Sequence, residues 1–229
     1  FSLHYNSENA SLMPALINTV IMTLLSLLLA VPIGIFSAIF LAEYAGKGNK
    51  FVDIIRLTTE TLSGIPSIVY GLFGMLFFVS TCHWGFSLLA GAFTLAIMIL
   101  PLIMRTTEEA LLSVPDSYRE GSFGLGAGKL RTVFYIVLPS AVPGILAGVI
   151  LAIGRIVGET AALIYTAGSV AQVPSSVLGS GRTLAVHMYL LASEGLYMDQ
   201  AYATAVILLV LVVVINTLSG MVAKKLTKA

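Results

Sequence analysis

The chain has 229 residues, of which 58% are hydrophobic and only 10% are charged, and its mean hydropathy is +0.98. This composition is far too apolar for a soluble domain, and a formal net charge of +1 argues against the basic face that nucleic-acid binding requires. Cys82 is the one cysteine, which excludes a disulfide within the chain and a cysteine-based metal cluster. We therefore expect an integral membrane protein.

Apolar runs of about 20 residues, the length that a helix needs to cross the hydrocarbon core, recur along the sequence. They are continuous rather than alternating in polarity, which favours helices over the strands of a membrane barrel. The expected fold class is all-α, with five membrane spans in this chain. The expected spans are residues 12–41, 61–79, 86–104, 133–154 and 202–222.

Positive charge predicts the orientation, because the cytoplasmic segments of membrane proteins carry an excess of Lys and Arg. Ten of the twelve Lys and Arg residues fall on one side of these spans, and Arg155 and Arg182 fall on the other. Residues 105–132 are then a cytoplasmic loop, and residues 1–11 and about 156–200 face outward. An external N-terminus that begins at Phe1 and five spans together predict a missing sixth span before this sequence. We expect a single transmembrane domain over 1–229.

A glycine-rich stretch of the cytoplasmic loop, EGSFGLGAGKL, superficially resembles a nucleotide-binding loop. A P-loop would need Gly in place of Phe123 and Ser or Thr in place of Leu130. A dinucleotide fingerprint would need its third Gly in place of Lys129, after a buried strand. Both motifs fail, so the chain is not expected to bind a nucleotide at these glycines.

The same loop is expected to form two short helices. Ser117 and Glu120 have the spacing of a capping box after Pro115, and the glycines end this helix before KLRTVFYIVLP begins another. Residues across both helices have the spacing of the EAA motif, which marks the membrane subunits of bacterial ABC importers: Glu120, Gly121, Ser122, Gly126, Ile136, Leu138 and Pro139. Gly121 and Ser122 replace the two alanines of that motif. The alternative is a plain helix–turn–helix in which Glu120 is only a cap.

Four stretches further resemble the A-type permease subunits of phosphate-specific ABC importers: FLAEYAGKGNKFVDIIR, GIPSIVYGLFG, RTTEEALLSVPDSYREGSFGLGAGK and AIGRIVGETAAL. The resemblance covers about residues 12–222. It implies a type I ABC importer transmembrane domain that translocates inorganic phosphate across the bacterial inner membrane. Six residues would couple it to an ATPase: Glu120, Gly121, Ser122, Gly126, Leu138 and Pro139. Permeases for sulfate, molybdate and tungstate share the EAA loop, so these anions remain alternatives.

The resemblance also implies partners. They are a second, non-identical permease subunit, two cytoplasmic ATPase subunits, an extracytoplasmic phosphate-binding protein and membrane lipid. ATP and Mg would be bound by the ATPase subunits, so this chain is expected to hold no cofactor and to be a transporter subunit rather than an enzyme. His4, His83 and His187 lack the spacing of metal ligands, and we expect no metal site.

Arg155 and Glu159 interrupt an apolar run and are the candidate residues of a substrate pathway. Their spacing of four predicts that both project from one helical face, and Arg155 would lie about 25 Å along the helix from Leu138. An ionisable residue at that depth is costly unless it is paired or lines a wet cavity. A guanidinium group there could contact an oxyanion transiently. The alternatives are a structural salt bridge, an Arg that reaches the interface, or a passive anion channel, which would need no EAA loop.

Overall fold

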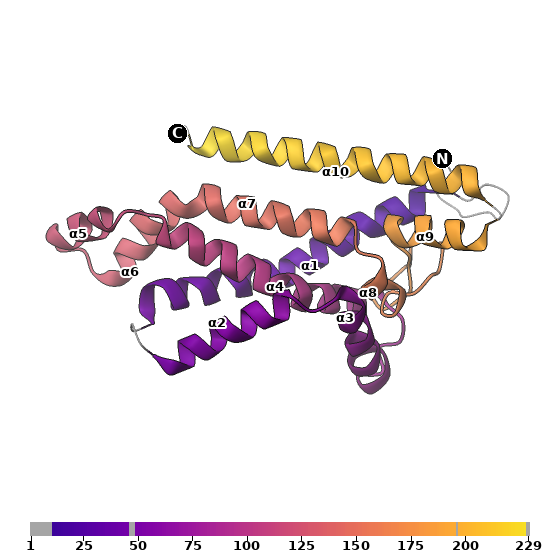
Figure 1. The fold of residues 1–229 in the computed structure, drawn as a ribbon, viewed down its shortest axis with the longest axis horizontal. Coiled ribbons are helices and arrows are strands. Elements are labelled where there is room, and N and C mark those ends of the chain that lie inside the picture. Colours follow the sequence, from indigo (N-terminus) through magenta and orange to yellow (C-terminus); the bar gives the residue numbers. More distant parts are fainter. Residues whose placement is uncertain (1–10, 46–48, 196, 228–229) are drawn as a thin grey trace. The chain divides into compact units, whose positions relative to one another are not determined.

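A computed structural model describes residues 11–45, 49–195 and 197–227 of the chain (Figure 1). Every regular element in these ranges is a helix, which confirms the all-α fold class. Residues 1–10 of the predicted external segment, with His4, lie outside the described residues. The elements are α1 (Met13–Ile39), η1 (Phe40–Tyr44), α2 (Lys50–Ser63), α3 (Ser67–Gly74), η2 (Met75–Thr81), α4 (Leu88–Leu112), α5 (Asp116–Gly124), α6 (Lys129–Thr132), η3 (Val133–Val137), α7 (Leu138–Val157), α8 (Ala161–Ile164), α9 (Leu184–Glu194) and α10 (Met198–Thr227), where η marks π-helices.

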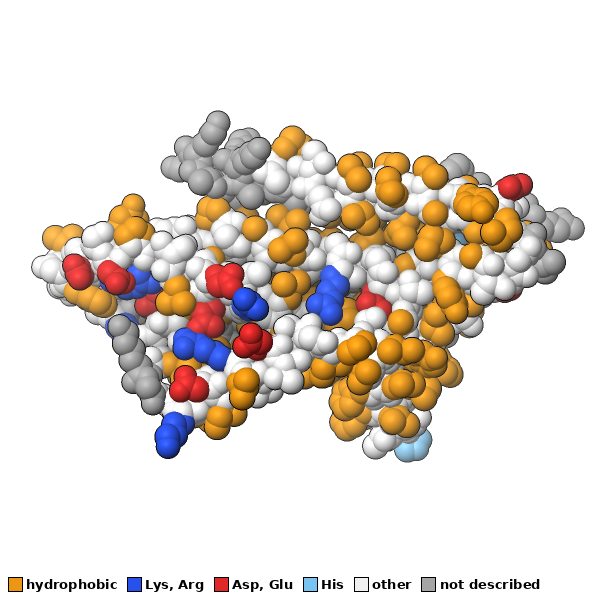
Figure 2. Space-filling model, viewed as in Figure 1, with side chains coloured by type: hydrophobic (Ala, Val, Ile, Leu, Met, Phe, Trp, Pro, Cys, Tyr) orange, Lys and Arg blue, Asp and Glu red, His pale blue; other side chains and the backbone are white. Residues whose placement is uncertain are grey.

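Four helical segments are long and apolar enough to cross a membrane: Met13–Tyr44, Leu88–Leu112, Lys129–Val157 and Met198–Leu218. They coincide with four of the five predicted runs. Figure 2 shows hydrophobic side chains along the surface of α10, where Tyr202, Val206 and Leu209 are each more than 60% exposed. An outward apolar surface of this kind suits a lipid environment, because lipid tails accept exposed Leu and Val without cost.

The predicted span 61–79 is not one continuous helix in the structure. Helix α2 ends at Ser63, and the next helical segment, Ser67–Thr81, runs at 101° to it. Pro66 explains the break, because it lacks a backbone N–H and disfavours helical geometry at the residue before it. The two segments together form a fifth candidate span that is broken, or a re-entrant loop.

The chain divides into two compact units, and each boundary falls within or beside a helix. Unit 1 contains Phe1–Leu29, Ile65–Ile99 and Ile153–Ile215. Unit 2 contains Ala30–Gly64, Leu100–Ala152 and Asn216–Ala229. The predicted cytoplasmic loop belongs to unit 2, whereas most of the predicted external segment belongs to unit 1.

Unit 1 is organised around the close contact of α3 with α8. A Cβ atom at Gly71 would lie only 2.8 Å from the Cα atom of Ala162, so a glycine is required for this approach. The segment 165–183 then folds over the start of α4, where the backbone N–H of Leu89 donates to the carbonyl oxygen of Val177 at 2.8 Å. Such bonds satisfy donors that a helix start leaves unpaired.

Unit 2 packs the ends of α1, α4 and α7 around one apolar cluster, which holds the predicted loop in place. The buried members of the cluster are Ile39, Ala110, Leu111, Val114, Val133, Val137, Ala141 and Ile145. Small residues let the helices approach: a Cβ atom at Gly144 would lie 2.7 Å from the Cβ of Ala110, and one at Gly34 would lie 2.7 Å from Cγ2 of Ile103. This is how membrane helices gain packing contacts without a hydrophobic driving force.

Candidate functional site

The predicted cytoplasmic loop, 105–132, begins within α4, and its part from Asp116 onward forms a helix–turn–helix made of α5, a glycine turn and α6. Gly126 has a φ of +84°, a left-handed conformation that favours glycine. The backbone N–H of Gly126 donates to the carbonyl oxygen of Phe123 at 2.9 Å, and that of Ala127 donates to the carbonyl oxygen of Ser122 at 3.1 Å. These two bonds form a Schellman motif, which ends α5 and reverses the chain. The two predicted helices and the glycine turn are therefore confirmed.

The predicted capping box at the start of the loop is wrong. Helix α5 begins at Asp116, and Pro115 takes the N-cap position without a side-chain capping bond. Ser117 therefore lies inside the first turn, where its hydroxyl cannot cap the helix. The physical reason is that Pro115 has the fixed φ that suits a helix start, and Asp116 places a negative charge in the first turn.

A side-chain contact that the sequence did not reveal joins the two arms of the helix–turn–helix. The hydroxyl groups of Ser122 on α5 and Thr132 on α6 lie 2.8 Å apart. Thr132 is buried, and its hydroxyl also donates to the carbonyl oxygen of Gly128 at 3.2 Å. Ser122 thus has a structural role in the fold of the loop besides its place in the predicted motif.

The helix–turn–helix and η3 border an open hollow of about 430 Å³, named here the loop hollow. Its lining residues are Ser117, Tyr118, Gly121, Ser122, Leu125, Gly126, Ala127, Arg131 and Ile136. Three of the predicted coupling residues, Gly121, Ser122 and Gly126, therefore share one concave surface. Apolar side chains project around it, and Leu125 is 91% exposed. An exposed apolar rim of this kind is typical of a surface that binds another protein.

The other three predicted coupling residues do not line the loop hollow. Glu120 lies on α5 with its side chain exposed. Leu138 is half-buried against the apolar cluster of unit 2, and Pro139 is exposed at the start of α7. Leu138 and Pro139 thus lie where the loop continues into a membrane-spanning helix.

The geometry predicted for Arg155 and Glu159 is wrong, because Glu159 does not lie on the helix that carries Arg155. Helix α7 ends at Val157, and the backbone N–H of Glu159 closes a tighter turn by donating to the carbonyl oxygen of Ile156 at 3.1 Å. Glycine at position 158 favours an end at this point. The four ion pairs found among the described residues do not include one between Arg155 and Glu159.

Glu159 instead caps the short helix α8. Its Oε1 accepts a hydrogen bond from the backbone N–H of Ala162 at 3.0 Å, and the residue is only 9% exposed. Arg155 is half-buried in the last turn of α7. The carboxylate is therefore held by backbone, and the guanidinium group of Arg155 is not neutralised by it directly.

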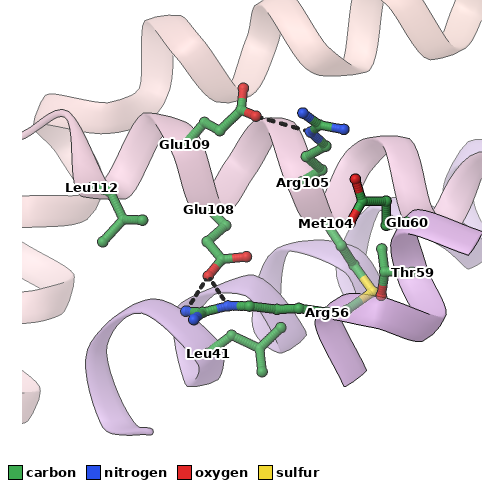
Figure 3. A pocket seen from close by; sticks show the side chains of 9 residues that line it. All are labelled: Leu41, Arg56, Thr59, Glu60, Met104, Arg105, Glu108, Glu109 and Leu112. Carbon is green, nitrogen blue, oxygen red and sulfur yellow. Dashed lines mark hydrogen bonds and ion pairs between the residues drawn. The ribbon is translucent and has the colours of Figure 1, made fainter. Parts of the chain in front are cut away.

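A pocket of about 230 Å³ between α2 and α4 collects charged residues of both signs (Figure 3). Arg56 on α2 pairs with Glu108 on α4, with Nη2 and Oε1 at 2.6 Å, and Arg105 pairs with Glu109 at 3.0 Å. The sticks in Figure 3 show Glu60 beside Met104 in the same pocket. Each guanidinium group already holds a carboxylate, whose negative charge opposes the binding of an anion here.

Comparison with known proteins identifies the family of this chain. Residues 30–228 match the family described as binding-protein-dependent transport system inner membrane components. The "Probable ABC transporter permease protein YqgI" of Bacillus subtilis is 37% identical in an alignment 232 residues long, which spans 93% of this chain and 79% of that protein. The "Phosphate transport system permease protein PstA 1" of Mycobacterium tuberculosis is 35% identical over 211 residues, which cover 91% of this chain and 69% of that protein.

A solved structure has the same fold. The inward-facing MetNI methionine ABC transporter matches with a TM-score of 0.79 and 21% identity, over 97% of this chain and 100% of the matched chain. The chain therefore belongs to the family of binding-protein-dependent transport system inner membrane components. It is a multi-pass permease subunit of an ABC importer with a type I transmembrane domain.

Proposed function

We propose that this chain translocates inorganic phosphate across the inner membrane as part of an ATP-driven importer. The observation that carries the coupled mechanism is the exposed helix–turn–helix, whose loop hollow is lined by Gly121, Ser122 and Gly126 of the EAA-like motif. Phosphate is favoured over other anions by the 35% identity to a phosphate transport permease of Mycobacterium tuberculosis. In this proposal residues 1–229 form one permease domain with a coupling loop at 105–132.

The coupling step uses the shape of the loop. A protruding side chain of a partner ATPase would occupy the loop hollow, where Gly121 leaves open space, since a Cβ atom there would meet no heavy atom within 4 Å. Leu125 and Tyr118, which are 91% and 51% exposed, would be covered by the same partner. Burial of such side chains contributes about 25 cal/mol per Å² of apolar surface removed from water.

ATP and Mg belong to the partner subunits in this proposal, and hydrolysis drives the permease between inward-open and outward-open forms through α5. The permease would pair with a second, non-identical permease subunit and two ATPase subunits. An extracytoplasmic phosphate-binding protein would deliver the anion to the outer side, where segment 156–200 is proposed to lie.

Arg155 and Glu159 remain the proposed residues of the substrate pathway, with roles revised by the geometry. Glu159 is held by the backbone of α8, so it positions the segment after α7 rather than the side chain of Arg155. Arg155 then offers a planar guanidinium fork to an oxyanion. Because a permease must release its substrate, one such contact suits transport better than a site that binds the anion tightly through many contacts.

Uptake of labelled phosphate by vesicles that hold the assembled complex tests this function. We expect uptake that unlabelled phosphate competes away and that sulfate, molybdate and tungstate leave unchanged. Preferential competition by one of these three anions would leave the assignment as an importer unchanged, but that anion would become the proposed substrate. Co-purification of the chain with ATPase subunits tests the coupling independently of the anion.

A further inference from the structure

Arg119 on α5 joins three parts of unit 2 through one guanidinium group. Its Nη2 donates to Oε1 of Glu43 at 2.6 Å and to the carbonyl oxygen of Leu111 at 2.9 Å. Its Nη1 donates to the carbonyl oxygen of Val114 at 2.7 Å and to Oδ1 of Asp116 at 3.3 Å. The first span ends at Glu43 and Tyr44, and α4 ends beside Leu111. A single side chain therefore connects the ends of two spans to the helix proposed to couple the chain to an ATPase.

These contacts are mostly shielded from water. The side chain of Arg119 is 15% exposed and that of Glu43 is 8% exposed, whereas the third ionic partner, Asp116, is 87% exposed. The hydrogen bond with Glu43 is the main cause that raises the pKa of Arg119, so this group stays charged at any physiological pH. The carbonyl oxygens at the end of a helix lack partners within it, and Arg119 donates to the carbonyl oxygen of Leu111 in the last turn of α4 and to that of Val114 just after it.

The second arm of the loop contacts the neighbouring residue of the same span. Nζ of Lys129 on α6 lies 5.2 Å from the centroid of the Tyr44 ring, within the range of a cation–π interaction. Glu43 and Tyr44 are adjacent in the π-helical segment η1, a kind of irregular turn that often occurs at functional sites. Both arms of the helix–turn–helix therefore hold the end of the first span.

We propose that Arg119 is a positioning residue that transmits movement of the coupling helix to the first span through Glu43. The inference rests on the proposed ATP-driven function, since it assigns the route by which loop movement reaches a membrane helix. Arginine is required there because lysine cannot donate to Glu43 and to two carbonyl oxygens from one planar group. If this contact were lost, the partner subunits would still hydrolyse ATP, but less anion would be transported per ATP hydrolysed.

Two substitutions test this in the complete importer, reconstituted with its ATPase subunits and binding protein. Arg119→Lys keeps the charge, and Glu43→Gln keeps the shape of the carboxylate. In both variants we expect normal amounts of complex, ATP hydrolysis within about twofold of wild type, and about tenfold less phosphate taken up per ATP hydrolysed. Asp116→Asn is the matched control, because it removes the exposed partner of the same arginine and should change neither quantity.

A cross-link provides a second, independent readout. The variant E43C/R119C, made with Cys82→Ser, should show the same low uptake per ATP. A short bifunctional methanethiosulfonate reagent that joins the two thiols should restore uptake, and a reducing agent should abolish it again. A purely structural contact would not give this reversible gain, because the reagent restores the link and none of the hydrogen bonds to carbonyl oxygens.

Three results would overturn the inference: wild-type uptake per ATP in both single variants, loss of the assembled complex in both, or a cross-link that forms without restoring uptake. Failure of the proposed function would appear elsewhere, as the absence of ATP-driven phosphate uptake by the wild-type complex. In that case the amount of anion taken up per ATP hydrolysed is measured with whichever oxyanion the wild-type complex imports, so the two failures are distinguishable.

Discussion

Gly121→Leu should separate the folding of the loop from its docking on a partner. Gly121 lies inside α5, and a Cβ atom there would meet no heavy atom within 4 Å, so a leucine side chain starts into open space rather than against the chain. Leucine also favours helix over glycine by about 0.7 kcal/mol. The free energy of unfolding of the isolated subunit should therefore stay constant or rise by about that amount.

Docking should respond in the opposite direction. Gly121 lines the loop hollow of about 430 Å³, and a leucine side chain would project into the space proposed for the ATPase. Overpacking of a fitted contact costs about 1–3 kcal/mol, which weakens binding by about 5- to 150-fold. Affinity of the purified ATPase for the permease in nanodiscs measures the effect directly.

A matched control lies on the same helix. Gly124 also has open space at its Cβ position but does not line the loop hollow, so Gly124→Leu should bind the ATPase within about twofold of wild type. Equal affinity of Gly121→Leu and wild type would refute the assignment of the loop hollow as the docking surface. A loss of thermal stability in Gly121→Leu would instead refute the expected gain in the free energy of unfolding from helix propensity.

Three further predictions concern the turn, the orientation and the pathway. Gly126→Ala should destabilise the loop by about 1–2 kcal/mol, because position 126 has a φ of +84°. The bulky, charged Gly126→Glu should in addition reduce ATP hydrolysis coupled to transport, while the protein still inserts into the membrane. In a Cys82→Ser background, a cysteine at position 131 should react with a membrane-impermeant reagent only from the cytoplasmic side, and one at position 83 only from the external side. External labelling at position 131 would contradict the orientation. Gln at both Arg155 and Glu159 should abolish uptake at equal complex abundance, and wild-type uptake would remove these residues from the pathway.

Local signals explain what could be predicted of this fold. The apolar runs mark the membrane helices because their length and hydrophobicity are properties of single segments. The chain reversal at Gly126 could be predicted for the same reason, since the left-handed conformation at +84° depends on the residue itself. The break at Pro66 has an equally local cause, because proline lacks a backbone N–H, whereas the apolar run over 61–79 reports hydrophobicity and not helix continuity.

Contacts distant in sequence explain most of what could not be predicted. Arg119 and Glu43 are 76 residues apart, and Arg56 and Glu108 are 52 residues apart, so no periodic pattern joins them. The spacing of Arg155 and Glu159 was misleading for a different reason. A spacing of four aligns side chains only while the helix continues, and α7 ends at Val157.

The ATP requirement of phosphate flux tests the central claim most directly. Vesicles containing the assembled complex, with the binding protein on its extracytoplasmic side, are given a downhill phosphate gradient, and initial flux is measured with and without ATP on the ATPase side. An importer coupled through the helix–turn–helix should move phosphate rapidly only when ATP is present. Equal flux without ATP would contradict the account, because it would show a passive anion channel.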